Sequence, residues 1–158
     1  MEKVSDEDNS RLIWSLCVLL MVLGLQMIEA GCVRTKNVAS VFMRGFASFT
    51  ISIISSWLCG FMFSHSSGHY LLGYDSDYLI LYNVTSQEKS RWLLFSAISC
   101  LPSAIVASSM SERTHLTGHL ILSTFISIIV FPTSAHWLWS KGGWLFLQGC
   151  HDLGWLVL

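Results

Sequence analysis

The sequence predicts an all-α protein, a polytopic membrane helical bundle. Four long stretches contain no Asp, Glu, Lys or Arg: residues 12–28, 45–64, 92–111 and 116–139. A helix that rises about 1.5 Å per residue crosses a hydrocarbon core of about 30 Å in roughly 20 residues. Because lipid offers no hydrogen-bond partners to the backbone, apolar runs of this length are expected to be helical.

Composition agrees with this fold class and excludes others. Of the 158 residues, 53% are hydrophobic and only 12% are charged, whereas soluble domains are about 25% charged. The mean hydropathy is +0.56. A net charge of −1 with no basic stripe gives no electrostatic basis for binding nucleic acid. Neither a nucleophile–base pair nor a phosphate-cradling loop is recognisable, so we expect no enzyme and no cofactor.

The charge pattern divides the chain into a tail and one membrane domain. Residues 1–11 form an acidic N-terminal tail, unlike the basic start of a cleavable signal peptide, so the first span is expected to act as the targeting element. Residues 12–158 are expected to form the transmembrane domain. Its predicted spans cover approximately residues 12–30, 45–64, 92–111 and 116–139, followed by an incomplete fifth span from about residue 152.

The orientation of the spans follows from the links between them. The third and fourth spans are separated by so few residues that they are expected to form a tight antiparallel hairpin. The links expected inside hold four basic residues and the outer segments five, but the inner charges lie in much shorter links. With the tail outside, the sequon Asn83-Val84-Thr85 lies in the long outer loop, which makes Asn83 a candidate glycosylation site.

Small residues recur on one face of the second span. Ser48, Ser52 and Ser56 follow an i, i+4 spacing. Small residues at this spacing let helices approach closely in lipid, so we expect helix packing rather than a hydroxyl-lined path. The five cysteines have no C-x-x-C spacing, and those inside the spans are interpreted as small packing residues.

Two histidine pairs have a spacing that two zinc ligands on one helix can use. They are His65 with His69 and His115 with His119. Neither pair has an identifiable third ligand, so no metal site is predicted.

The densest cluster of functional residue types follows the fourth span. It runs His136-Trp137-Leu138-Trp139, then Gly142-Gly143-Trp144, then His151-Asp152. Tryptophan is enriched at the membrane–water interface, so composition alone favours an aromatic belt. An indole face beside a carboxylate can also attract a small cation through the ring quadrupole. The residue types leave both interpretations open.

Three blocks, in this order, carry a family resemblance. Residues 24–38 read GLQMIEAGCVRTKNV, residues 109–114 read SMSERT, and residues 131–145 read FPTSAHWLWSKGGWL. They resemble G-(L/F)-x3-E-(S/A)-G-x-V-x-x-K-N, G-A-x-A-E-R and Y-P-x3-H-x-V-W-G-x-G-G, which are motifs of the ammonium transporter family. The resemblance covers essentially the whole chain after residue 10 and is weakest in residues 65–90.

The resemblance implies a fold, a substrate and a site. In the family, helices surround one pore per subunit and three subunits form a homotrimer, so a homotrimer in the plasma membrane is expected. Ammonium would be recruited at an aromatic outer vestibule and conducted as ammonia. Trp139 would match the tryptophan that binds ammonium, where a cation over an indole face gains roughly 1–2 kcal/mol. Asp152 would match the buried aspartate that shapes the mouth electrostatically.

The chain also departs from the family pattern. Alignment on Glu112 places Leu94 and Ile98 where the family has two phenylalanines, and Phe95 supplies a ring only with a one-residue shift. The sequence ends before the family's pore histidines. We therefore expect an incomplete family member with a partial ammonium-transporter-like fold, in which transport by the chain alone is doubtful. The alternative is a four-span membrane scaffold or interaction protein without transport activity.

Overall fold

The computed structural model describes residues 2–65, 85–110, 114–140 and 142–149, and every regular element in these ranges is helical. Four helical segments are long and apolar enough to cross a membrane: Asp6–Cys32, Thr35–His65, Gln87–Met110 and Leu116–Leu147. The predicted all-α, multi-pass membrane bundle is thus confirmed.

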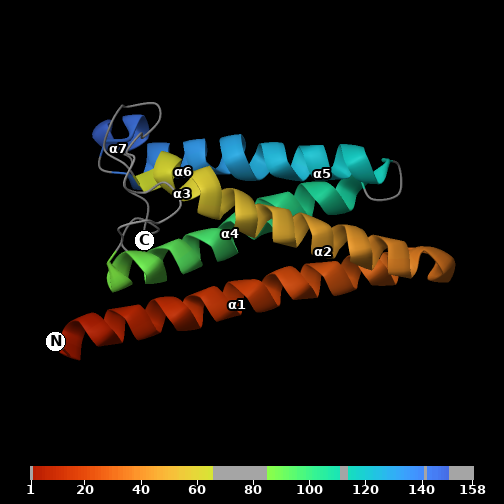
Figure 1. Ribbon diagram of the computed structural model, residues 1–158, viewed down its shortest axis with the longest axis horizontal. Helices are drawn as coiled ribbons and strands as arrows, with labels where there is room; N and C mark the ends of the chain where they lie inside the picture. Colours follow the sequence, from red (N-terminus) through yellow and green to blue (C-terminus); the bar gives the residue numbers. More distant parts are fainter. Residues whose placement is uncertain (1, 66–84, 111–113, 141, 150–158) are drawn as a thin grey trace.

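The described helices follow one another along the chain (Figure 1). The first two spans contain α1 (Glu2–Cys32), the 3₁₀ turn η1 (Thr35–Asn37), α2 (Val38–Ser55), the π-helical turn η2 (Ser56–Gly60) and α3 (Phe61–His65). The remaining elements are α4 (Ser86–Met110), α5 (Leu116–Phe125), the π-helical turn η4 (Ile126–Val130), α6 (Phe131–Trp139) and α7 (Trp144–Leu147).

Helices α1 and α4 run in one direction, and α2 and the α5–α6 segment run back in the other (Figure 1). The N-terminus, α3, the start of α4, α6 and α7 therefore gather at one end, which we call the N-terminal end of the bundle. Helix α1 packs on α4, α4 on α2, and α2 on α5. The α1–α4 and α2–α5 pairs are therefore parallel, and the α2–α4 pair is antiparallel (Figure 1).

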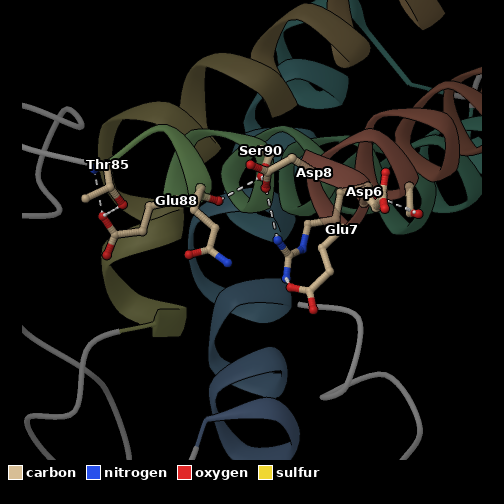
Figure 2. Close-up of polar contacts among 9 residues, drawn as sticks. Asp6, Glu7, Asp8, Thr85, Glu88 and Ser90 are labelled. Atoms are coloured by element: carbon tan, nitrogen blue, oxygen red, sulfur yellow. Dashed lines mark hydrogen bonds and ion pairs between the residues drawn. The ribbon is translucent and has the colours of Figure 1, made fainter. Parts of the chain in front are cut away.

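Helix α1 begins in the acidic segment, before the apolar run that starts at residue 12. Arg11 is only 8% exposed. Its guanidinium lies 3.2 Å from Asp8 and 3.8 Å from Glu7, at i−3 and i−4, which are neighbours on a helix surface. The Ser90 hydroxyl donates to Asp8 Oδ1 at 2.7 Å and so ties this turn to the start of α4 (Figure 2).

The start of α4 carries its own cap. The carboxylate of Glu88 accepts from the Thr85 backbone N–H at 2.9 Å and from the Thr85 hydroxyl at 2.8 Å (Figure 2). A carboxylate at this position compensates backbone N–H groups that have no partner inside the helix. The cap and the Asp8–Ser90 bond together fix where α4 begins against α1.

A row of buried hydrogen bonds joins α2 to the α5–η4 segment. Ser48 Oγ lies 2.6 Å from His119 Nε2 and 3.0 Å from Ser123 Oγ. Ser52 Oγ lies 2.8 Å from Ser127 Oγ. All five side chains are at most 2% exposed. We call this set of five residues the polar seam.

The polar seam forms because both helices repeat small or polar residues at i, i+4 and run in the same direction. The row on one helix therefore meets the row on the other over two successive turns. Such bonds between membrane helices contribute about 0.6 kcal/mol on average. The close packing expected at Ser48 and Ser52 is present, with hydrogen bonds added. Ser56 instead donates to the Ile53 carbonyl of its own helix at 2.8 Å.

The π-helical turn η4 precedes Pro132, the second residue of α6. Proline has no N–H and its ring clashes with the carbonyl four residues earlier, which here belongs to Ile128 within η4. A π-helical turn widens the helix at that point and accommodates the clash. The span therefore continues through Pro132 to Trp139.

Candidate aromatic site at the N-terminal end of the bundle

Rings from three helices meet at the N-terminal end of the bundle. We call Phe61, His65, Phe95, Phe131 and Trp139 the aromatic cluster. Phe95 of α4 lies centrally, with ring centroids 5.9 Å from Phe61, 5.8 Å from His65 and 5.1 Å from Phe131. Trp139 lies edge-on to Phe131 at 6.3 Å.

Helical spacing explains the pairs within each element. Phe61 and His65 of α3 are four residues apart and stack at 4.3 Å. Phe131 and Trp139 lie eight residues apart on α6, about two turns, so both rings project from one face. Phe61 and Phe95 are almost fully buried. The cluster is thus the apolar core of this end of the bundle.

Several polar atoms around these rings are buried without a hydrogen-bond partner in the described part of the chain. They are Ser64 Oγ, His65 Nδ1, Arg91 Nε, Trp92 Nε1 and Trp139 Nε1. Unsatisfied buried polar atoms are rare in native proteins, and each calls for a structural or functional reason. Their concentration at this end marks it as the candidate site.

The end of α6 is fixed by a turn that folds back on it. Ser140 has extended φ and ψ and ends the helix, while its N–H donates to the His136 carbonyl at 3.2 Å. Gly143 N–H donates to the Ser140 carbonyl at 2.9 Å. His136 itself is fully buried, and its Nδ1 lies 3.1 Å from the Ser64 carbonyl oxygen of α3.

Of the predicted site residues, the structure describes Trp139 but not Asp152 or Asn83. Trp139 is the last residue of α6 and belongs to the aromatic cluster. Asp152 and Asn83 lie outside the described residues, so their predicted roles stay predictions. Phe95 joins the cluster with its side chain fully buried, and Leu94 is also buried, with 2% exposed.

The histidine pairs do not form helical ligand pairs in the described residues. His115 is exposed and precedes α5, whereas His119 is buried in the polar seam. His69 lies outside the described residues. Among the described residues, no group of three His, Cys, Asp or Glu side chains could hold a metal ion.

Sequence reasoning missed most of the aromatic cluster. Phe61 and His65 have i, i+4 spacing, and Phe131 and Trp139 have i, i+8 spacing, so each pair could have been read as one helix face. Their meeting across α3, α4 and α6 depends on contacts between residues that are far apart in sequence. No local signal reports those contacts.

These features define a multi-pass α-helical membrane protein with an aromatic site at one end of its bundle. The model of the Ammonium Transporter Family matches residues 10–155 of this sequence. The match covers nearly the whole chain, and the chain therefore belongs to the ammonium transporter family. This agrees with the resemblance carried by the three sequence blocks.

Curated relatives of the chain are named ammonium transporters. The chain is similar to ammonium transporter 1 member 3 of Solanum lycopersicum, with 33% identity over 81% of the chain and 28% of the relative. It is 29% identical to ammonium transporter 3 of Dictyostelium discoideum, over 85% of the chain and 31% of the relative. It is 30% identical to ammonium transporter Amt2 of Archaeoglobus fulgidus, over 85% of the chain and 29% of the relative. The chain thus spans about 30% of the length of these relatives.

Proposed function

We propose that the chain acts in ammonium transport and recruits ammonium at the aromatic cluster, with Trp139 as the binding residue. The observation that carries this proposal is the position of Trp139, which ends α6 beside rings from α3 and α4. The relatives' names supply the substrate. Asp152 is proposed to add negative charge at the same mouth.

The chemistry of an aromatic end suits a small cation. The negative faces of aromatic rings attract ammonium, and the attraction grows as the ion loses water. Moving a charged ammonium ion into lipid costs several kcal/mol, whereas neutral ammonia avoids the cost of burying a charge. Ammonium is therefore proposed to give a proton to water at the outer side and to continue as ammonia. A homotrimer in the plasma membrane is part of the same proposal.

Uptake of methylammonium by transporter-deficient cells tests the proposal. The chain is expressed alone and together with a fragment of a relative that supplies the remaining helices. Trp139→Leu should raise the half-saturating concentration roughly 5- to 30-fold, because a cation–π contact of about 1–2 kcal/mol is lost.

The matched control is Trp14→Leu, since Trp14 is 58% exposed on α1 and distant from the cluster in sequence. It should leave uptake unchanged. Absence of uptake in both expression formats, or uptake that ignores Trp139, would reject the proposal.

A four-span scaffold is the second candidate. It is favoured by α1, which has broad exposed apolar surface, including Ile13, Leu16, Leu20 and Ile28, each at least 59% exposed. Such a face suits lipid or a partner helix. A stable assembly that captures a membrane partner and shows no ammonium response would favour this candidate.

A further inference from the structure

Among the described residues, the indole N–H of Trp139 has no polar anchor. Its Nε1 is buried and has no hydrogen-bond partner among the described residues. Its ring lies edge-on to Phe131, with centroids 6.3 Å apart, and packs against the buried core of Phe61, Phe95 and Ala135. The direction in which the indole faces therefore depends on this packing and on the backbone of the last turn of α6.

His136 supplies a polar anchor on that turn. It lies three residues before Trp139, is fully buried, and has Nδ1 3.1 Å from the Ser64 carbonyl oxygen. A carbonyl oxygen can only accept, so Nδ1 carries the hydrogen and donates it. The bond joins the last turn of α6 to the last turn of α3, which are the two helices that contribute Trp139, Phe61 and His65.

On its other side, the last turn of α6 contacts the backbone of the residues that follow it. The His136 carbonyl accepts from the Ser140 N–H, and Gly143 packs directly against the His136 and Trp137 carbonyls. His136 is thus held at both its backbone and its ring. A change at the ring would release the turn toward α3 while leaving the Ser140 turn intact.

We propose that His136 is a positioning residue for Trp139. Its Nδ1–H bond to the Ser64 carbonyl fixes the last turn of α6 against α3 and so sets the direction of the indole that receives ammonium. The inference rests on the proposed function of Trp139, and it adds a residue that acts through Trp139 without touching the substrate.

The first test needs no variant. In the ¹⁵N NMR spectrum of the histidine-labelled chain in lipid nanodiscs, the His136 ring should carry hydrogen on Nδ1. His136→Asn assigns its signals by their disappearance. A ring with hydrogen on Nε2 alone and a bare Nδ1 would overturn the proposal, because a bare nitrogen cannot donate to Ser64.

The second test compares two amides. The nitrogen of Asn lies where His carries Nδ1 and can donate to Ser64, whereas the longer Gln places its nitrogen farther out. With 5-fluorotryptophan, and with Trp139→Phe to assign the signal, His136→Gln should shift or broaden the ¹⁹F resonance of Trp139. It should also raise the half-saturating ammonium chloride concentration roughly twofold to tenfold, as expected for one lost buried hydrogen bond. His136→Asn should restore both values.

His115→Gln is the matched control, because His115 is exposed and lies before α5, away from the aromatic cluster. It should leave the Trp139 resonance unchanged. An unchanged resonance in folded His136→Gln would overturn the proposal, and if that variant does not fold, the tautomer measurement decides. A wild-type resonance that ignores ammonium would reject the proposed function, while the Gln and Asn comparison would still test positioning.

Discussion

Gly143 shows how a single residue shapes the aromatic end of the bundle. Its φ of −67° and ψ of 143° are open to any residue, so the need for glycine is steric. A Cβ at this position would overlap the His136 carbonyl oxygen and would also crowd the Trp137 carbonyl. Backbone atoms cannot rotate away as a flexible side chain can, so the turn after Trp139 would have to move.

Gly143→Ala should therefore destabilise the protein by about 1–3 kcal/mol, the usual cost of overpacking. The measurement is SDS-induced unfolding of the purified chain, followed by circular dichroism. Gly142→Ala is the control, because a Cβ there meets nothing within 4 Å. Equal stabilities for the two variants would contradict this account of the turn.

Single residues were also where the sequence was least informative about the site. The position of Trp139 at the end of a span could be predicted from its motif, while its role in binding stays a prediction. The partner of His136 could not, because Ser64 lies 72 residues earlier and contributes a backbone atom. Phe95 could be named only as a ring that a one-residue shift would supply, because alignment placed Leu94 and Ile98 at the family's phenylalanine positions and gave no view of which α4 face meets α3 and α6.

At the scale of helices, hydrophobicity predicted the spans but not their ends. Lack of charge marks the part of a helix that lies in lipid, and α2 and α4 both extend beyond it. The acidic segment before residue 12 is helical too, and Arg11 pairs there with residues one turn earlier. The sequence predicted the polar seam in part. The spacing of Ser48 and Ser52 predicted close helix packing, but it did not predict hydrogen bonds to Ser123 and Ser127, which repeat the same spacing.

The polar seam yields a prediction about helix association. A double-mutant cycle with Ser52→Ala and Ser127→Ala should give a coupling energy of about 0.6 kcal/mol, and no more than about 1.7 kcal/mol. The measurement is the free energy of SDS-induced unfolding of the wild type, both single variants and the double variant.

The control cycle pairs Ser52→Ala with Ser109→Ala, because Ser109 is exposed and donates to Val106 of its own helix at 2.8 Å. Its coupling energy should be zero within error. A coupling of zero for Ser52 and Ser127 would show that their 2.8 Å contact does not hold α2 to the α5–η4 segment.

At the scale of the whole molecule, the fold brings three distant segments to one end. Antiparallel spans return α3, the start of α4 and α6 to the N-terminal end, where the aromatic cluster forms (Figure 1). The Asp8–Ser90 bond and the Thr85–Glu88 cap fix α1 and α4 beside it (Figure 2). Membership of the ammonium transporter family gives this end its proposed substrate.

Titration of the chain in lipid nanodiscs with ammonium chloride tests the central claim most directly, with the ¹⁹F resonance of 5-fluorotryptophan at position 139 as the signal. Sodium chloride at the same ionic strength is the control, because sodium shares the charge of ammonium but is more strongly hydrated. We predict a saturable shift of the Trp139 resonance with ammonium and a much smaller one with sodium. No saturable shift, or the same shift with both salts, would contradict ammonium recruitment at Trp139.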